Sequence, residues 1–172
     1  MSLKLIIGPM YSGKSTTLIK LSKTTKNNLI INHSFDKRYG ENTISTHDKK
    51  QIKCFMFSDL QDIFELENYN EIENIYIDEI QFFNNITKHI LKMIEDDNKN
   101  VICCGLDGTF ERKPFKTLEL IPYCDELIKL YSKCNYCSNK ALFSKRLIKN
   151  ESKILVGSSG VYAAVCRKHY KD

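Results

Sequence analysis

The sequence contains no apolar run that approaches the roughly 20 residues needed to cross a bilayer, which excludes a polytopic membrane protein. Proline and glycine are scarce, with three and seven copies in 172 residues, so the chain has neither a collagen repeat nor a linker rich in these residues. Hydrophobic residues make up 42% of the chain and charged residues 27%, a balance that excludes a disordered protein. We therefore expect one compact domain, or one domain with a small appendage, and no membrane partner.

The cysteines exclude a further class of proteins. Seven is an odd number, and the first apolar stretch, Leu3 to Ile7, is too short for the core of a signal peptide. A secreted disulfide framework is therefore not expected, and the protein is expected in the cytoplasm. Burial in the core is the expected role of four cysteines, which are Cys54, Cys103, Cys104 and Cys124.

The net charge is only slightly positive. The 26 Lys and Arg residues exceed the 21 Asp and Glu residues by five, which favours anionic ligands but does not identify a nucleic acid. A protein that binds single strands would interleave aromatic residues with Lys and Arg on one face. Lys145, Arg146, Arg167, Lys168 and Lys171 supply charge without such a stripe. We therefore expect a solvated, lysine-rich surface and no nucleic-acid partner.

Strands and helices are predicted to alternate over residues 1–131, which we call the N-terminal unit. Short apolar runs predict strands over residues 3–7, 29–31, 75–77 and 101–106. Apolar residues at helical spacing predict helices over residues 15–26, after a cap at Ser58, and over residues 86–94. The polar stretch 36–50 is predicted to be a loop. This alternation predicts an α/β fold with a parallel sheet.

The character of the sequence changes near residue 132. No helical period is evident beyond this point, and short strand-like pieces at 141–143 and 154–156 are separated by Gly, Ser and Asn. We therefore expect a second, smaller and β-rich unit over residues 132–172, called the C-terminal unit below.

The first predicted strand runs directly into a phosphate-binding motif. Its residues match G-x-x-x-x-G-K-[ST] in full, and they are Gly8, Pro9, Met10, Tyr11, Ser12, Gly13, Lys14 and Ser15. The glycines let backbone N–H groups turn toward one phosphate, and the helix that follows presents its positive end to the same anion. We expect Lys14 to reach the β- and γ-phosphate oxygens of ATP and the Ser15 hydroxyl to bind Mg²⁺.

Another predicted strand ends in two carboxylates, Asp78 and Glu79. In a P-loop protein such an Asp holds Mg²⁺, and an adjacent Glu is a candidate general base. If Glu79 deprotonates water, the protein is an ATPase or a motor. If Glu79 deprotonates a substrate hydroxyl, the protein is a kinase, which must also cover its site to exclude water. The motif leaves both readings open, because the chemistry at the phosphate is the same.

The C-terminal unit carries a metal-ligand pattern. Cys134 and Cys137 form a C-x-x-C pair, and Cys166 and His169 form a C-x-x-H pair. Together the two pairs supply three sulfurs and one nitrogen, a tetrahedral set that suits Zn²⁺ in a closed, structural site. A redox C-x-x-C pair is the weaker alternative, because it gives no role to Cys166 and His169.

Several strings occur together in an order typical of one family. They are Gly8–Thr16, Thr46–Asp48, Ile77–Phe83, Leu106–Phe110 and Lys145–Leu147. On these strings the chain resembles the type II thymidine kinases over almost its whole length. The resemblance implies a RecA-like P-loop domain over residues 1–131 and a zinc domain over residues 132–172. It also implies ATP-dependent phosphorylation of the thymidine 5′-hydroxyl, feedback inhibition by dTTP and a homotetramer.

The resemblance also implies roles for individual residues. Glu79 matches the general base, and Asp36, Arg38 and Gln81 join the motif residues and Asp78 in the ATP- and Mg²⁺-binding set. The positions that match the nucleoside pocket are Met10, Leu106, Phe110, Ser144 and Tyr162. Lys153, Ile154, Leu155, Val156 and Gly157 match a substrate-covering segment known as the lasso. The zinc ligands match Cys134, Cys137, Cys166 and His169.

Two alternatives stay open at this point. A nucleic-acid-dependent ATPase would use the zinc unit to bind DNA, and its ATPase activity would respond to DNA rather than to thymidine. A kinase for another nucleoside, such as deoxycytidine or deoxyadenosine, would share every motif named above.

Overall fold

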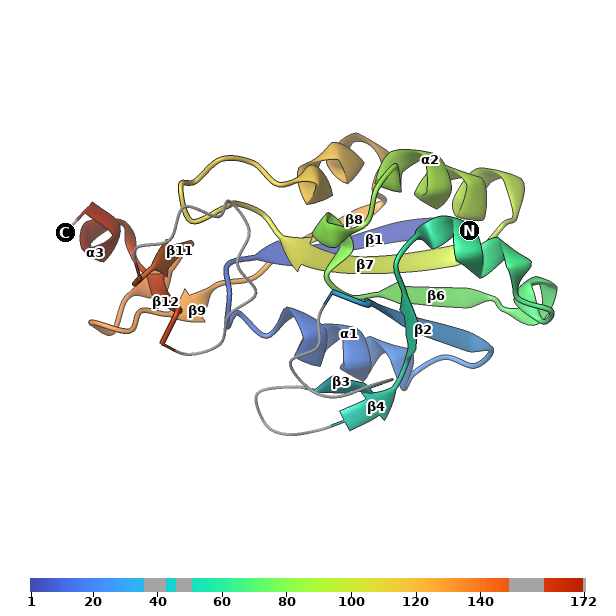
Figure 1. Ribbon diagram of the computed structural model, residues 1–172, viewed down its shortest axis with the longest axis horizontal. Coiled ribbons are helices and arrows are strands. Elements are labelled where there is room, and N and C mark those ends of the chain that lie inside the picture. The colour runs from blue at the N-terminus through green and yellow to red at the C-terminus, as the bar shows by residue number, and fades with distance from the viewer. Residues whose placement is uncertain (36–42, 46–50, 149–159, 172) are drawn as a thin grey trace.

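The computed structural model describes residues 1–35, 43–45, 51–148 and 160–171, and a six-stranded sheet forms its centre (Figure 1). The strands stand in the order β5-β2-β6-β7-β1-β8, and each neighbouring pair is parallel. The six strands are β1 (Ser2–Gly8), β2 (Asn28–His33), β5 (Phe55–Phe57), β6 (Asn74–Ile77), β7 (Asn100–Leu106) and β8 (Glu126–Lys129). The predicted α/β fold with a parallel sheet is confirmed.

Helical segments cover both faces of the sheet, because strand side chains alternate between the two faces. On one face, Leu18 of the first helix joins a cluster with Ile6 and Tyr76. On the other, Ile90 of the second helix joins a cluster with Leu5. Figure 1 shows α1 and α2 on opposite sides of the strands. The helical segments are α1 (Lys14–Ser22), η1 (Leu60–Glu65), η2 (Tyr69–Glu71), η3 (Ile80–Phe82), α2 (Ile86–Leu91), η4 (Lys92–Asp96), η5 (Lys116–Tyr123) and α3 (Arg167–Lys171).

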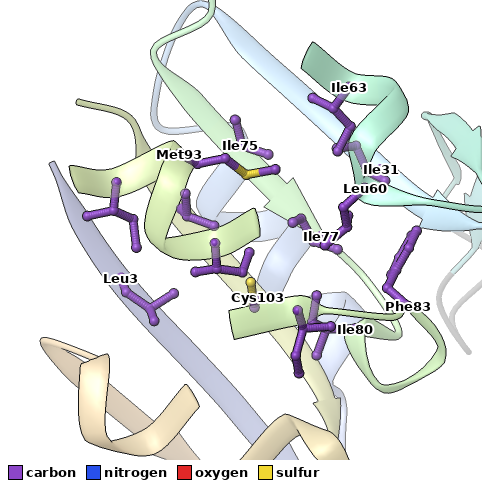
Figure 2. Packing of buried hydrophobic residues seen from close by; sticks show 14 of the residues in the cluster. Leu3, Ile31, Leu60, Ile63, Ile75, Ile77, Ile80, Phe83, Met93 and Cys103 are labelled. Atoms are coloured by element: carbon purple, nitrogen blue, oxygen red, sulfur yellow. The ribbon is translucent and has the colours of Figure 1, made fainter. Parts of the chain in front are cut away.

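The larger hydrophobic cluster lies on the α2 face of the sheet (Figure 2). Leu3, Ile75, Ile77 and Cys103 come from three neighbouring strands and are fully buried, and Met93 of η4 covers them. Fully burying one side chain of this size stabilises a fold by about 1.5–3 kcal/mol. This cluster therefore fixes the register of the strands that carry the site described below. Within the described ranges, no helix combines the length and apolar character that a bilayer crossing requires.

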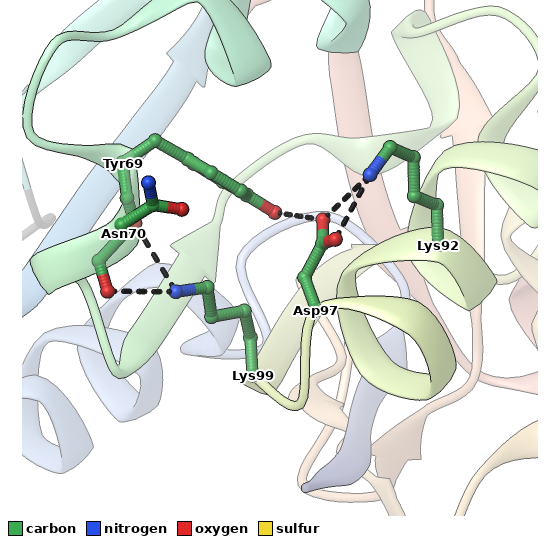
Figure 3. A network of polar contacts seen from close by, with 5 residues as sticks. All are labelled: Tyr69, Asn70, Lys92, Asp97 and Lys99. Atoms are coloured by element: carbon green, nitrogen blue, oxygen red, sulfur yellow. Dashed lines mark hydrogen bonds and ion pairs between the residues drawn. The ribbon is translucent and has the colours of Figure 1, made fainter.

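A polar network ties η2 to the end of η4 (Figure 3). The Tyr69 hydroxyl donates to Asp97 at 2.7 Å, and the Lys92 ammonium donates to both oxygens of the same carboxylate at 2.9 Å. Lys99 donates to the carbonyl oxygens of Tyr69 and Asn70 at 3.1 and 3.3 Å. Burial acts to raise the pKa of Asp97, but the hydrogen bonds from Tyr69 and Lys92 outweigh it and lower that pKa. The network therefore stabilises the ionised form of Asp97.

The described part of the C-terminal unit contains two short antiparallel pairs and one turn of helix. β9 (Ser132–Lys133) pairs with β10 (Lys140–Ala141), and β11 (Phe143–Arg146) pairs with β12 (Tyr162–Val165). The prediction of a β-rich unit is confirmed for its described part, and the strand-like piece at 154–156 lies outside the described residues. A third antiparallel pair, β3 (Thr43–Ser45) with β4 (Gln51–Lys53), belongs to the N-terminal unit.

Three local predictions were wrong in their details. The helix predicted over residues 15–26 ends at Ser22, because Thr24 and Asn28 side chains bind the carbonyl oxygens of Leu21 and Ser22. The predicted loop at 36–50 contains β3. The predicted helix over 86–94 is α-helical to Leu91 and continues as a π-helix from Lys92.

The predicted cap at Ser58 was also wrong. The Ser58 hydroxyl lies 2.7 Å from that of Ser34, and the neighbouring Asp59 side chain accepts the Gln61 N–H at 2.9 Å instead. The segment that Asp59 caps, η1, is a 3₁₀-helix rather than an α-helix.

Candidate active site

The phosphate-binding loop connects β1 to α1 and needs a glycine at each end for a different reason. A Cβ atom on Gly8 would lie 2.5 Å from the Leu130 carbonyl oxygen, so only glycine allows this approach. Gly13 has space around it but a φ of +82°, a left-handed conformation that glycine adopts at little cost. Tyr11 also has a positive φ, +63°. The motif thus folds as the strand–loop–helix that binds phosphate in P-loop proteins.

The Lys14 side chain folds back over this loop. Its ammonium donates to the Pro9 carbonyl oxygen at 2.8 Å, and the Ser12 hydroxyl donates to the same oxygen at 2.8 Å. Lys14 is only 7% exposed. The ammonium is therefore held at the phosphate loop rather than in solvent.

The Asp78 carboxylate lies at the end of β6, beside the start of α1. It is 2% exposed and accepts hydrogen bonds from Ser15 and from the Cys104 thiol, the latter at 2.7 Å. Burial, and after it the nearby Glu79 charge, raises the pKa of Asp78. The two hydrogen bonds and the Lys14 charge act to lower it, and the result is a pKa of about 6. A carboxylate and a hydroxyl side by side are hard oxygen donors of the kind that Mg²⁺ prefers. Ser15 and Asp78 therefore fit the predicted Mg²⁺-binding role.

Glu79 is held in place by Gln81. Glu79 adopts a left-handed φ of +51° and its N–H donates to Asp78. The Gln81 amide donates to the Glu79 carboxylate, and its oxygen accepts the Leu106 N–H at 3.0 Å. A Cβ atom on Gly105 would lie 2.5 Å from that Gln81 oxygen. Glycine at 105 therefore makes room for Gln81, which fixes the direction of the candidate base.

The C-terminal unit packs directly on the phosphate loop. The Met10 N–H donates to the Ser144 hydroxyl of β11 at 3.0 Å, and the Tyr11 hydroxyl donates to the Tyr162 carbonyl oxygen at 3.4 Å. Ser144 and Tyr162 are both buried. Two residues predicted for the nucleoside pocket therefore lie against the loop predicted to bind ATP, although more than 130 positions separate Met10 from Ser144.

Arg146 joins the aromatic residues of the predicted pocket. Its guanidinium carbon lies 3.8 Å from the centre of the Phe110 ring, and the guanidinium donates to the Tyr162 hydroxyl at 2.7 Å. Such a cation over an aromatic face is attractive and orients both groups. Sequence reasoning did not assign Arg146 to the site. The available signals were its place in the Lys145–Leu147 string and its position two residues after Ser144.

The C-x-x-C pair and the C-x-x-H pair lie close together in the structure. All four candidate ligand atoms lie within 4.8 Å of one another. The Cys137 and Cys166 sulfurs are 3.8 Å apart, and His169 Nδ1 lies 3.5 Å from the Cys134 sulfur and 3.3 Å from that of Cys166. Tetrahedral zinc, at about 2.3 Å from sulfur and about 2.0 Å from nitrogen, would space sulfurs by about 3.8 Å and sulfur from nitrogen by about 3.5 Å. The set fits zinc.

The surroundings of Cys134 favour its thiolate form. Loss of solvent acts to raise the pKa of this thiol, but the backbone N–H groups of Tyr136 and Cys166 and the His169 ring lower it to about 6. The Cys166 N–H lies 3.3 Å from the Cys134 sulfur. Zinc binds the deprotonated thiol, so this environment suits a metal ligand.

Comparison with known proteins decides the family. A family model described as thymidine kinase matches residues 1–170. The chain belongs to the thymidine kinase family. The relatives include thymidine kinase a of Arabidopsis thaliana, which is 38% identical over 173 residues, with 96% of this chain and 73% of the plant protein covered. The thymidine kinase of Myxoma virus (strain Uriarra) is 44% identical over 172 residues, covering 96% and 94% of the two chains. That of Vaccinia virus (strain Western Reserve) is 40% identical over 175 residues, covering 99% and 97%.

The structure brings together most of the residues that the thymidine kinase resemblance implied. Asp78, Glu79 and Gln81 lie together beside the phosphate loop. Ser144 and Tyr162 contact that loop, and Phe110 and Tyr162 contact Arg146. Leu106 is the last residue of β7, and its N–H donates to the Gln81 side-chain oxygen. Asp36, Arg38 and the lasso residues Lys153–Gly157 lie outside the described residues.

Cys104 and Gln81 also make contacts that the sequence motifs did not predict. Cys104 was expected only to fill the core, and it is indeed fully buried, yet its thiol contacts Asp78. Gln81 was predicted for the ATP-binding set, and its amide donates to the Glu79 carboxylate.

Proposed function

We propose that this member of the thymidine kinase family transfers the γ-phosphoryl group of ATP to the 5′-hydroxyl of thymidine, giving thymidine monophosphate. The observation that carries the proposal is the junction at Met10, where the phosphate loop meets the β11–β12 pair. One side of that junction holds the phosphate loop and the two acids, and the other holds the residues expected at a nucleoside. A phosphoryl donor and a nucleoside acceptor would therefore meet there.

Each residue of the proposed mechanism has a distinct task. Lys14, together with the backbone N–H groups of the loop, binds and orients the β- and γ-phosphates. Glu79 accepts the proton of the thymidine 5′-hydroxyl as that oxygen attacks the γ-phosphorus. Gln81 holds the Glu79 carboxylate in one direction, which supports proton transfer along a fixed line. Asp36 and Arg38 are proposed near the phosphates on the family resemblance alone.

Ser15 and Asp78 are the residues that would hold Mg²⁺. The Ser15 hydroxyl and the Asp78 carboxylate share a hydrogen bond. The Cys104 thiol and the Lys14 charge also favour the ionised form of Asp78. When bound, Mg²⁺ neutralises charge that develops on the phosphates during transfer.

The proposed nucleoside pocket is formed by Met10, Leu106, Phe110, Ser144 and Tyr162, with the lasso residues Lys153–Gly157 covering it. Its apolar side chains suit the 5-methyl group of thymine, and a pocket of this kind distinguishes one methyl group by about 1–3 kcal/mol. Purine nucleosides would be excluded by their size.

A structural zinc in the C-terminal unit, held by Cys134, Cys137, Cys166 and His169, completes the proposal. We propose residues 1–131 as the ATP-binding domain and residues 132–172 as the zinc domain. None of the seven cysteines forms a disulfide, which agrees with a reducing, cytoplasmic environment. The homotetramer and the inhibition by dTTP rest on the family resemblance.

The decisive experiment measures phosphoryl transfer from radiolabelled ATP with thymidine, deoxycytidine, deoxyadenosine or single-stranded DNA as the second component. We expect thymidine monophosphate with thymidine and no response to DNA. A similar kcat/KM for deoxyadenosine and thymidine would contradict the thymidine assignment. ATP hydrolysis that DNA stimulates and thymidine does not would replace the kinase by the nucleic-acid-dependent ATPase.

A further inference from the structure

The loop after β7 reaches from the sheet to the C-terminal unit (Figure 1). Its base is closed by its own backbone, since the Thr109 N–H donates to the Lys113 carbonyl oxygen at 2.8 Å and the Arg112 N–H donates to that of Thr109 at 2.9 Å. The turn between these bonds carries Phe110, whose ring belongs to the proposed nucleoside pocket. The position of this ring therefore depends on what holds the tip of the loop.

Tyr170 holds that tip. Its hydroxyl donates to the Phe110 carbonyl oxygen at 2.8 Å, across 60 positions of sequence. The Arg112 guanidinium lies 4.3 Å from the centre of the Tyr170 ring, and the Phe143 ring lies 5.4 Å from it. Tyr170 thus makes three interactions: a hydrogen bond, a contact with a cation and a contact with a second ring. Together they fix the position of the loop relative to Tyr170.

Tyr170 is in turn positioned by the candidate zinc site. It follows the ligand His169 on α3, its N–H donates to the Cys166 carbonyl oxygen at 3.0 Å, and Lys145 donates to the His169 carbonyl oxygen at 3.0 Å. A helix of one turn is not stable on its own in water. The convergence of His169 with Cys134 and Cys166 is what sets the place of α3.

The Phe110 ring contacts Arg146, which in turn contacts Tyr162 of the proposed pocket. Arg146 lies 3.8 Å from the centre of that ring and bonds to Tyr162 at 2.7 Å. A displacement of the Phe110 backbone would therefore move Arg146 and Tyr162 as well. We propose that Tyr170 is a positioning residue for nucleoside binding, which transmits the geometry of the metal-ligand cluster to the Phe110 wall of the pocket. This inference rests on the proposed function.

Tyr170→Phe tests the inference, because it removes only the hydroxyl and keeps the ring for Arg112 and Phe143. One hydrogen bond of this kind changes an equilibrium by roughly 2- to 10-fold. We expect KM for thymidine, and the thymidine dissociation constant measured by calorimetry without ATP, to rise by about that factor. KM for ATP, kcat and zinc content should remain those of the wild type.

Tyr136→Phe is the matched control. Tyr136 belongs to the same unit, its ring centre lies 5.5 Å from that of His169, and the residue is 54% exposed. We expect no change in thymidine affinity. Arg112→Gln, which removes the cation over the Tyr170 ring without altering α3, should weaken thymidine binding in the same direction by a smaller factor.

The outcomes separate the inference from the proposed function. If the wild-type protein phosphorylates thymidine and Tyr170→Phe and Arg112→Gln both bind it as tightly as the wild type, Tyr170 does not position the pocket. A parallel loss of ATP and thymidine affinity, or loss of zinc, would also overturn the inference, because it would indicate general destabilisation. Wild-type protein that binds no thymidine would instead remove the proposed function itself.

Discussion

The two units of this chain are stabilised in different ways. The N-terminal unit buries a large apolar cluster in which Leu, Ile, Phe and Met side chains from the sheet and its helices meet. The cluster of the C-terminal unit has only six buried members among the described residues: three alanines, one valine and two of the candidate zinc ligands. Burial of apolar area can stabilise the first unit, whereas the second has little apolar area to bury.

The C-terminal unit is small, yet it supplies half of the proposed site. The C-terminal unit contributes Ser144, Arg146 and Tyr162, and its few contacts must be as well positioned as those on the sheet. A closed metal site supplies binding free energy that is also folding free energy.

Lys14→Ala should remove activity from the N-terminal unit without unfolding it. The Lys14 ammonium provides charge where negative charge develops on the phosphates, and the loss of such a group lowers kcat by roughly 10³-fold or more. Thymidine phosphorylation and circular dichroism, measured on the same preparation, check this. Normal turnover by Lys14→Ala would remove the phosphate loop from the mechanism.

Glu79→Gln should lower kcat by about 10²- to 10⁴-fold, because an amide cannot accept the hydroxyl proton. Binding of ATP and thymidine should be kept. Gln81→Leu leaves the Glu79 carboxylate in place but removes the hydrogen bond that it accepts from Gln81. This variant should lower kcat by a smaller factor than Glu79→Gln. Turnover within a few-fold of the wild type for Glu79→Gln would show that another group is the base.

His169→Ala should act on the C-terminal unit first. With one ligand lost, the unit should loosen while the sheet stays folded, so KM for thymidine should rise far more than KM for ATP, and futile ATP hydrolysis should rise relative to transfer. His169→Cys should restore both, because a thiolate satisfies the same tetrahedral preference. Metal analysis should find about one zinc per wild-type chain. Wild-type protein without zinc, or unchanged thymidine affinity in His169→Ala, would contradict this coupling.

Val101→Ala and Val165→Ala form a matched pair, since both valines are fully buried but in different units. Val101→Ala should lower the free energy of unfolding of the sheet by about 1.5 kcal/mol. Val165→Ala should leave the melting temperature of the sheet unchanged and speed the loss of zinc to a chelator. Equal effects of the two substitutions on one shared melting transition would show that the units unfold together.

Asp97→Asn should give a small, pH-dependent loss of stability in the N-terminal unit. The pKa of Asp97 is lowered in the folded state, so its contribution is full above the unfolded pKa of about 4 and disappears as pH falls through the folded pKa. We expect the variant to be less stable by about 1–2 kcal/mol at pH 7, and the difference from wild type to shrink at pH values below about 4. Urea unfolding at a series of pH values measures this. A difference that stays constant with pH would exclude the ion pair as its cause.

Much of the fold followed from local patterns. The apolar runs predicted β1, β2, β6 and β7, and the P-loop motif placed a loop and a helix after the first of them. The errors arose where polar side chains compete with the helix backbone, as Thr24 and Asn28 do at the end of α1. A periodic pattern does not reveal such competition.

The groups that can do chemistry are evident from the sequence alone. Each of these motifs lies within a short stretch of sequence, so its spacing alone predicts its chemistry. The motifs are the P-loop, the Asp78–Glu79 pair, the C-x-x-C pair and the C-x-x-H pair. The groups that support them became evident only in the folded chain: Gln81 at Glu79, Cys104 at Asp78, and Tyr170 at the Phe110 loop. The Cys104 and Tyr170 contacts join residues 26 and 60 positions apart. They depend on how strands stack and units dock, and no local pattern encodes that packing.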